Sequence, residues 1–320
     1  MSMTLEVIDA QTVRARLPMR DCIEAMVPAM IAAHTKTAAI PPRTIMHLVD
    51  GSGYFGVMPG SLREPLIYGT KVVSLHPANP AAGRPAIQGF VALFDPVTGA
   101  PAALVDGAEI TAMRTAAASA LATRLLARPG SRSLGVIGCG AQAVSHVQAI
   151  SLVRDIEEVR VWGRSVEKAR AFCERYAEIL PGKIRAVRTA EEAAGCDVVC
   201  TVTGANEPVI RGDWVQPGAH INLVGAHTRN TREADTALIL RSRVFVDSIE
   251  SALNEAGDLL IPLEERAIER SHVIAEIGAL LVGNIPGRRE GSDVTLYKSL
   301  GLTVQDLVCA HAVLAASGTF

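Results

Sequence analysis

Hydrophobic and polar positions follow two different patterns along the chain. Up to residue 105, short β-rich runs are separated by turn signals, which indicates a mostly antiparallel sheet. Beyond residue 130, short apolar strands alternate with helical patterns, which indicates a parallel sheet covered by helices. The predicted strands are 55–59, 68–75, 87–94 and 101–105 in the first region, and 134–137, 159–162, 198–203, 221–224 and 244–246 in the second.

Helical segments accompany both patterns. Residues 19–35 are predicted to form a helix that ends before the prolines of segment 40–43, and the Ala-rich residues 110–126 form a second helix. Residues 303–316 form a last helix, which we expect to return and pack on the first region. The sequence therefore predicts an α/β protein with a doubly wound parallel sheet of five strands and a second, mostly antiparallel domain.

A glycine-rich turn follows the predicted strand 134–137. Gly138, Gly140 and Ala143 form a Gly-x-Gly-x-x-Ala pattern that opens a helix, the form of a turn that binds a dinucleotide pyrophosphate. Gly138 permits the turn, Gly140 lets the backbone approach the phosphates, and the helix dipole favours the anion. The alternative is a glycine-rich turn that binds nothing.

The end of the next strand bears on the choice of cofactor. No Asp or Glu stands there to bind the ribose of NAD; Gly163, Arg164 and Ser165 occupy the position. Gly163 leaves room, Arg164 can pair with a 2′-phosphate in a bidentate manner, and Ser165 is a further donor. This pattern favours NADP(H), with NAD(H) possible, and a solvent-exposed arginine is the alternative for Arg164.

Composition narrows the class of protein. The 320 residues exceed the size at which a single core stops growing, and 49% of them are hydrophobic, enough for two domains. A net charge of −2 without a basic stripe gives no support for nucleic-acid binding. We find no signal peptide and no membrane span, and expect a cytoplasmic protein. The six cysteines lack a Cys-x-x-Cys pair, which favours reduced thiols and no metal site.

Three cations of the first region lie in unusual surroundings. Lys71 lies within an apolar strand, Arg114 is the only charged residue between 110 and 123, and Arg43 follows two prolines. Burying a cation alone costs several kcal/mol, so a buried cation here needs an anionic partner; the alternative is a surface side chain whose charged end reaches solvent. That partner is either an internal acid or a substrate carboxylate, and three cations in a dinucleotide-binding protein favour the substrate. His227, just past a strand of the parallel sheet, lies where ligands of such sheets bind.

Several stretches match a known family. They are 55–59, 70–73, 106–107, 110–117, 138–142, 207–208, 217–226 and 292–301. Through them the sequence resembles the ornithine cyclodeaminase and mu-crystallin family over nearly its whole length. The resemblance implies a Rossmann domain, residues 115–302, inserted into an α+β domain that binds substrate and mediates homodimerisation, residues 1–114 completed by 303–320.

The resemblance also implies residue roles. Arg43, Lys71 and Arg114 would hold a substrate carboxylate. The implied pyrophosphate contacts are Gly138, Gly140, Ala141 and Gln142, and the implied phosphate or nicotinamide contacts are Thr115, Thr203, Val224 and Ser292. Ornithine cyclodeaminases carry acids where this chain has Gly56 and His227, so the departures argue against cyclodeamination.

These observations together predict an NAD(P)H-dependent reductase of a cyclic imino acid such as Δ1-pyrroline-2-carboxylate. Hydride would pass to the carbon of a C=N bond beside a carboxylate, with Lys71 or His227 as the proton donor. The alternatives are an ornithine cyclodeaminase, an alanine dehydrogenase, and a mu-crystallin-like protein that binds NADPH and a small ligand without catalysis.

Overall fold

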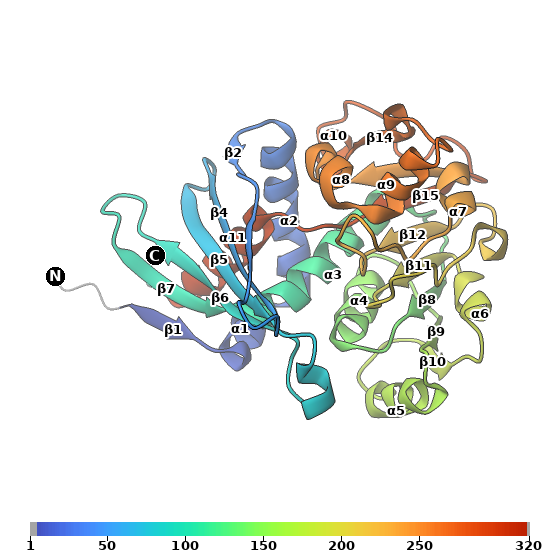
Figure 1. Ribbon diagram of the computed structural model, residues 1–320, viewed down its shortest axis with the longest axis horizontal. Coiled ribbons are helices and arrows are strands. Elements are labelled where there is room, and N and C mark those ends of the chain that lie inside the picture. Colours follow the sequence, from blue (N-terminus) through green and yellow to red (C-terminus); the bar gives the residue numbers. More distant parts are fainter. Residues whose placement is uncertain (1–4, 319–320) are drawn as a thin grey trace. The chain divides into compact units, whose positions relative to one another are not determined.

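The computed structural model describes residues 5–318, and the chain forms two compact units. The first unit comprises Met1–Arg114 and Leu302–Phe320, and the second comprises Thr115–Gly301. Figure 1 shows the strands and helices of each unit. Helix α3 (Gly107–Leu126) begins in the first unit and continues into the second.

A seven-stranded sheet forms the centre of the first unit. Its order is β1-β7-β6-β5-β4-β2, with β3 also paired to β4, and every pairing except that of β1 with β7 is antiparallel. The strands are β1 (Glu6–Ile8), β2 (Ala38–Ala39), β3 (Thr44–His47), β4 (Tyr54–Leu62), β5 (Ile67–Leu75), β6 (Ile87–Phe94) and β7 (Pro101–Asp106). The four predicted strands are confirmed, and the three that sequence reasoning missed are two to four residues long.

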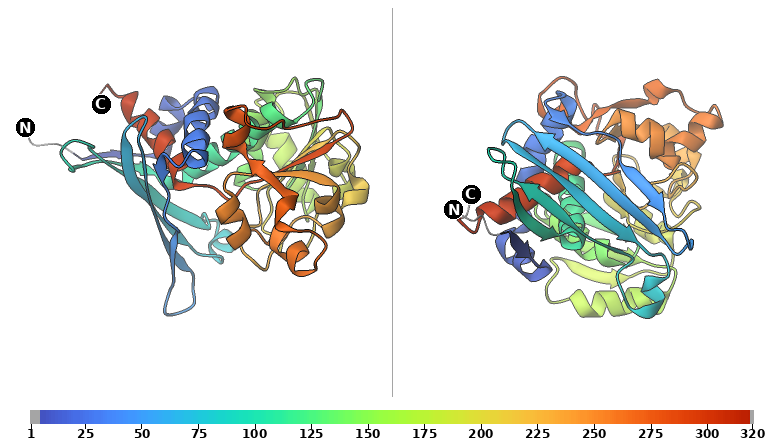
Figure 2. Two further views of the ribbon diagram at one scale, coloured as in Figure 1. Left: turned by 90° about the horizontal axis from the view of Figure 1, so that it is seen from above. Right: turned by 60° about the vertical axis from the view of Figure 1, so that its left-hand side comes forward.

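Helices cover one face of this sheet. Helix α11 (Thr303–Ala315) packs against β4, β5, β6 and α2 (Met19–His34), so the last segment of the chain does return to the first region. Figure 2 shows the strands in front of this helix. The contact is close, because a methyl group added at Gly69 of β5 would come within 3.1 Å of Leu307 and 2.1 Å of the Ala92 carbonyl. Helix α1 (Ala10–Arg16) contacts β7.

The second unit contains an eight-stranded sheet in which all pairings are parallel. The order is β10-β9-β8-β11-β12-β15-β13-β14. The strands are β8 (Ser133–Ile137), β9 (Glu158–Trp162), β10 (Lys183–Ala186), β11 (Val198–Thr201), β12 (His220–Leu223), β13 (Ser242–Val246), β14 (Val273–Glu276) and β15 (Val294–Lys298). The predicted parallel sheet is confirmed, but the prediction of five strands is wrong because β10, β14 and β15 were missed.

The order of the strands reverses at β8. The chain runs from β8 through β9 to β10 on one side, and then through β11 to β12 on the other. In such a sheet the carboxyl ends of the two central strands, here β8 and β11, form the usual ligand-binding edge. The remaining α-helices of the unit are α4 (Ala141–Ser151), α5 (Val166–Tyr176), α6 (Ala190–Ala194), α7 (Thr236–Arg241), α8 (Ile249–Glu255), α9 (Gly257–Glu264) and α10 (Ile277–Leu281).

Other features bear on the expected class of protein. The six cysteines are free thiols. Within residues 5–318, no helix is long and apolar enough to cross a membrane, and no three or more His, Cys, Asp or Glu side chains are grouped to hold a metal ion.

Candidate active site

Lys71 and Arg114 meet at one buried carboxylate in the first unit. Lys71 lies on β5 with 3% of its surface exposed, and its ammonium donates to Asp306 Oδ1 at 2.8 Å. Arg114 lies on α3 with 6% exposed, and its Nε donates to the same oxygen at 3.1 Å. Arg114 also donates to Gln305 Oε1 at 3.1 Å. The first turn of α11 therefore supplies both acceptors.

The charges of this group do not balance. Two buried cations share one buried anion, which leaves one positive charge without an internal partner in the contacts of Lys71, Arg114 and Asp306. Burial lowers the pKa of Lys71 to about 8; Asp306 opposes this shift, and Arg114 and Arg43 add to it. Burial raises the pKa of Asp306, but the charges of Arg114 and Lys71 outweigh that and leave it below its ordinary value.

Arg43 belongs to the same electrostatic environment. It is half-buried in the extended segment before β3, and its charge reaches Lys71 strongly enough to lower the pKa of that ammonium. The fixed backbone of Pro41 and Pro42 precedes it, as the sequence indicated. The three predicted carboxylate ligands are therefore gathered in one electrostatic environment, in the first unit.

The sequence left two kinds of partner open for these cations, and the structure contains the internal one. Asp306 was missed because it lies in the apolar segment of the last helix, which was interpreted only as packing. A charged residue inside an apolar helical face was the available signal, since such a side chain is rarely buried without a partner.

Gly56 lies on the Lys71 face of the sheet. Met58 is directly opposite Lys71 across β4 and β5, and Gly56 is two residues earlier on the same face. A methyl group at Gly56 would come within 3.0 Å of a Val73 methyl. The position that carries an acid in cyclodeaminases, by the resemblance, is here a buried glycine that packs against the Val73 side chain.

The glycine-rich turn has the geometry that the sequence predicted for it. Gly138 has φ of 121°, a conformation that L side chains rarely adopt, and its N–H donates to the Trp162 carbonyl at 2.8 Å. Gly140 is the N-cap of α4 without a side-chain cap, and a methyl group there would meet no protein atom within 4 Å. The protein's own packing therefore does not require glycine at 140, whereas close approach of a ligand would.

The segment after β9 contains an exposed arginine and a serine that caps the next helix. Arg164 is exposed, and Gly163 is buried against Cys139, whose sulfur would lie 2.8 Å from an added methyl group. Ser165 caps α5: its hydroxyl accepts from the Lys168 N–H at 3.2 Å and donates to Glu167 at 2.8 Å. Ser165 is therefore already engaged in capping, and Arg164 carries the argument for a 2′-phosphate.

Residues expected near the nicotinamide follow β11 and β12. Val224 comes directly after β12, Thr203 comes two residues after the end of β11, and the Thr203 hydroxyl donates to Glu233 at 2.7 Å. His227 is exposed, with Nδ1 3.1 Å from the Gly225 carbonyl. Because the strands are parallel, these residues share the carboxyl edge with the turn at 138–142. Thr115 is buried on α3.

The prediction that Ser292 contacts the cofactor does not agree with its place in the sheet. It precedes β15, and its carbonyl accepts from the N–H of Gly218, which precedes β12, so both lie at the amino edge of the sheet. This is the opposite edge from the glycine-rich turn, which removes Ser292 from the candidate site. The error arose within the stretch 292–301, whose residues at the carboxyl edge are Lys298 and Ser299.

A second buried charged group was also missed. Glu233, Asp258 and Lys298 are each 0% exposed, and Lys298 pairs with Asp258 at 3.0 Å. Burial and then the charge of Asp258 raise the pKa of Glu233, whereas Lys298 and the hydroxyls of Thr201 and Thr203 lower it. No motif pointed to these residues, because they come from three separate segments of the chain.

We predict that Asp306→Asn lowers the free energy of unfolding by about 3–5 kcal/mol at pH 7, because it leaves two buried cations without an anion. Urea unfolding measures the change, with the exposed Asp213→Asn as a control expected near wild type. The deficit should shrink as pH rises toward about 8 and stay constant above it, because Asp306 raises the pKa of Lys71 and the variant therefore releases the Lys71 proton at a lower pH than the wild type. A deficit below 1 kcal/mol would contradict the charge coupling of this group.

Comparisons with known proteins agree on one family. The sequence matches the model of the ornithine cyclodeaminase/mu-crystallin family over residues 4–317. The ketimine reductase mu-crystallin of Mus musculus is 40% identical over 274 residues, which cover 85% of this chain and 83% of that protein. The Delta(1)-pyrroline-2-carboxylate reductase of Colwellia psychrerythraea is 34% identical over 317 residues, covering 97% of this chain and 98% of that protein.

The solved structures that resemble this chain include enzymes with the same names as its sequence relatives. Thermococcus litoralis Delta(1)-pyrroline-2-carboxylate reductase in complex with NADH and L-proline superposes with a TM-score of 0.95 and 36% identity, covering 98% of this chain and 97% of that one. An archaeal alanine dehydrogenase dimer with bound NAD has a TM-score of 0.92 and 30% identity, covering 98% and 96%. The α/β fold class predicted from the sequence is confirmed, and this chain belongs to the ornithine cyclodeaminase/mu-crystallin family.

Proposed function

We propose that this protein is an NAD(P)H-dependent reductase that converts a cyclic imino acid, such as Δ1-pyrroline-2-carboxylate, to the saturated amino acid. The observation that carries the proposal is the uncompensated positive charge of Lys71 and Arg114 around Asp306. A substrate carboxylate balances that charge. The Thermococcus litoralis relative, whose structure contains NADH and L-proline, supports the same substrate class.

The carboxylate ligands have donors to offer. The Lys71 ammonium has three N–H groups, of which Asp306 takes one, and Arg114 uses Nε and one terminal nitrogen within the protein. Arg43 adds a third cation whose charge reaches this group. Charge-assisted hydrogen bonds from such a group fix the orientation of the imine carbon beside the carboxylate.

Reduction adds a hydride to the imine carbon and a proton to its nitrogen. A bound reduced nicotinamide supplies the hydride. We assign the proton to the Lys71 ammonium, because a pKa of about 8 suits proton donation near neutral pH. Lys71 then regains its proton from solvent, and Asp306 stabilises the returned charge. His227 stays the second candidate donor.

The carboxyl edge of the parallel sheet suits a dinucleotide. Backbone N–H groups at the start of α4, the positive φ of Gly138 and the open Cα of Gly140 provide for the pyrophosphate. By the family resemblance Ala141 and Gln142 belong to the same contact. We propose a preference for NADPH over NADH, since Arg164 is exposed after β9, and the position lacks an acid.

We predict that the protein oxidises NADPH when given Δ1-pyrroline-2-carboxylate, and does so faster than with pyruvate plus ammonia. Lys71→Ala and Arg114→Ala should each lower kcat/KM about a hundredfold or more, since each removes a charge-assisted bond of about 3 kcal/mol. The matched control is Arg63→Ala, an exposed cation. Initial rates from nicotinamide absorbance measure all of these.

The pH profile tests the role of Lys71 within the same experiment. The kcat/KM of the wild type should fall as pH rises through about 8, where Lys71 deprotonates. Lys71→Arg keeps the charge but cannot release its proton, so it should stay as slow as Lys71→Ala. A Lys71→Arg variant near the wild-type rate would assign the proton to another group. Proline formed from ornithine without net cofactor change would replace the reductase proposal with cyclodeamination.

Cofactor preference has its own test. Arg164→Ala should raise the KM for NADPH at least tenfold and leave that for NADH within about twofold, because only the 2′-phosphate contact is lost. Arg170→Ala, another exposed arginine of the same region, is the control. Equal changes for both cofactors would remove Arg164 from 2′-phosphate binding.

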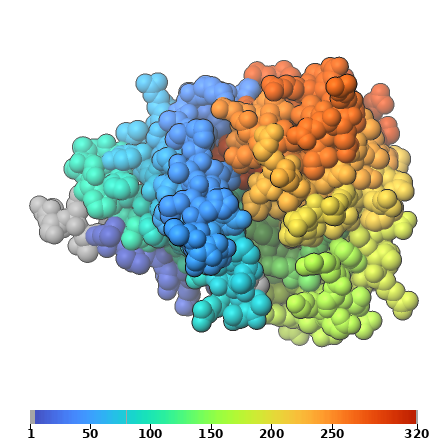
Figure 3. All heavy atoms as spheres, viewed as in Figure 1, coloured from blue at the N-terminus to red at the C-terminus, as the bar shows by residue number. Residues whose placement is uncertain are grey.

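One face of the first unit's sheet supports a homodimer. Met46, Phe55 and Phe90 are 54%, 37% and 38% exposed, and cross-strand pairing places them on one face. Lys71 has the opposite parity on β5, so this apolar face is the one away from α11. In Figure 3 the segment that includes β3 forms part of the surface. We assign the face to a second copy of the chain, consistent with the alanine dehydrogenase relative, which is a dimer.

We predict a solution mass of twice 33.8 kDa by light scattering, and a shift toward monomer for Phe90→Asp, because a buried unpaired charge opposes association. Val97→Asp changes another exposed apolar side chain, in a turn outside this face, and should stay dimeric. A dimeric Phe90→Asp protein would place the interface elsewhere.

A further inference from the structure

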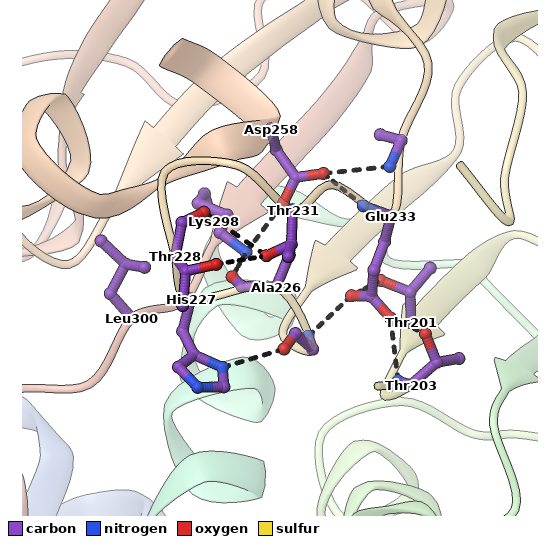
Figure 4. A network of polar contacts seen from close by, with 12 residues as sticks. Thr201, Thr203, Ala226, His227, Thr228, Thr231, Glu233, Asp258, Lys298 and Leu300 are labelled. Carbon is purple, nitrogen blue, oxygen red and sulfur yellow. Dashed lines mark hydrogen bonds and ion pairs between the residues drawn. The ribbon is translucent and has the colours of Figure 1, made fainter. Parts of the chain in front are cut away.

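Glu233 joins the ends of two central strands. It is 0% exposed, and its carboxylate accepts four hydrogen bonds. Two come from the backbone N–H groups of Thr203, at 2.8 Å, and Gly225, at 2.6 Å. The other two come from the hydroxyls of Thr201, at 2.6 Å, and Thr203, at 2.7 Å. Figure 4 shows this carboxylate between the segments that follow β11 and β12.

These segments fit tightly around the carboxylate. A methyl group added at Gly225 would lie 2.1 Å from the Thr203 carbonyl and 2.5 Å from Glu233 Oε1. The Thr203 hydroxyl in turn accepts from the Ala205 N–H at 3.1 Å, which extends the contact along the 203–205 segment. Glu233 thus sets the separation and direction of both segments.

Glu233 is itself held in place by Asp258 and Lys298, the other two members of the second buried charged group. Asp258 accepts from the N–H groups of Glu233, at 2.7 Å, and Ala234, at 3.0 Å. Lys298, at the end of β15, pairs with Asp258 at 3.0 Å and donates to the Ala226 carbonyl. The ends of β11, β12 and β15 are therefore connected through three charged side chains that solvent does not reach.

The strand order indicates which part of a dinucleotide meets these segments. The pyrophosphate turn follows β8, and the position for the adenosine ribose follows β9, on the β10 side. The other half of the dinucleotide, which carries the nicotinamide, then extends toward the ends of β11 and β12. Thr203 and Gly225, the backbone partners of Glu233, lie there.

We propose that Glu233 is a positioning residue for the nicotinamide half of the cofactor, acting through the 203–205 and 224–226 segments without touching the cofactor. This inference rests on the dinucleotide binding of the proposed function. It goes beyond that function by separating the determinants of nicotinamide binding from those of adenosine binding.

The isosteric variant Glu233→Gln tests the role of the carboxylate. An amide offers one accepting oxygen, so its NH2 group would face the N–H of either Thr203 or Gly225, donor against donor. One of the two segments must move. Glu233→Gln should weaken binding of the reduced cofactor at least tenfold, while the affinity for the matching ADP-ribose fragment, which lacks nicotinamide, changes less than twofold.

Nicotinamide fluorescence measures binding of the reduced cofactor, and calorimetry measures binding of the ADP-ribose fragment. If the protein binds NADPH more tightly than NADH, the fragment used carries a 2′-phosphate. Glu276→Gln is the matched control: Glu276 is also a buried glutamate, accepts the Ile249 N–H at 3.0 Å, and is the last residue of the outer strand β14. It should leave both affinities unchanged. Thr201→Val is a second variant, because Thr201 is 0% exposed and loses only its bond to Glu233.

Thr201→Val should show the same selective loss of affinity for the reduced cofactor, but a smaller one. This variant provides the test if Glu233→Gln does not fold. Parallel losses for cofactor and fragment, or no loss for either, would overturn the positioning role while leaving the proposed function in place. A wild-type protein that binds neither molecule would overturn both.

Discussion

The first unit depends on the sharing of one buried carboxylate by two cations. Asp306 binds Lys71 and Arg114, which lie 235 and 192 positions away along the chain. Because an isolated buried charge costs several kcal/mol, the start of α11 cannot leave this position without exposing or stranding charges. The same contact that fixes the last helix on the sheet leaves one positive charge over. The same three side chains therefore carry a structural constraint and the charge on which the proposed binding of a substrate carboxylate rests.

The buried charges of the second unit work differently. There, two acids and one lysine are buried, and the acceptors of Glu233 are taken up by backbone N–H groups and hydroxyls of neighbouring segments. In the first unit, by contrast, Lys71 and Arg114 keep N–H donors beyond those that Asp306 and Gln305 accept. Cations with donors to spare can bind a ligand, whereas a carboxylate such as Glu233, whose acceptors are taken by backbone N–H groups and hydroxyls, holds the segments that carry those donors in place.

Much of the fold and part of the candidate site could be predicted from the sequence, for identifiable physical reasons. The glycine-rich turn is a local feature, so Gly138 and Gly140 could be assigned from spacing alone. Lys71 and Arg114 stood out because a cation within an apolar segment needs a partner. The identity of that partner depends on how distant segments pack, and the periodicity of the sequence does not show this. Asp306 was missed for this reason, and so was Glu233 in the second unit.

The errors in the sheet have the same origin. Strand β10 alternates charged and apolar residues at an edge, and β15 carries Thr295 and Lys298 in its buried interior, so neither has the continuous apolar run expected of a parallel strand. Ser292 was misplaced because a motif match fixes residues in sequence but not at an edge of a sheet. Only the register of β15 with β12 shows that the motif crosses the sheet from one edge to the other.

The choice among related reactions rests on what surrounds the cation group. In the proposed reaction, hydride transfer to an imine requires only the carboxylate clamp that we propose for these cations, a bound dinucleotide and the proton that we assign to Lys71. Deamination also requires a group that activates water and one that serves the leaving amine. The position where cyclodeaminases carry the first of the two acids that distinguish them is Gly56, closed against Val73 on the Lys71 face, and the second is the exposed His227. The residues present therefore suit reduction of an imine, and the chain lacks, at these two positions, the acids that distinguish the cyclodeaminases.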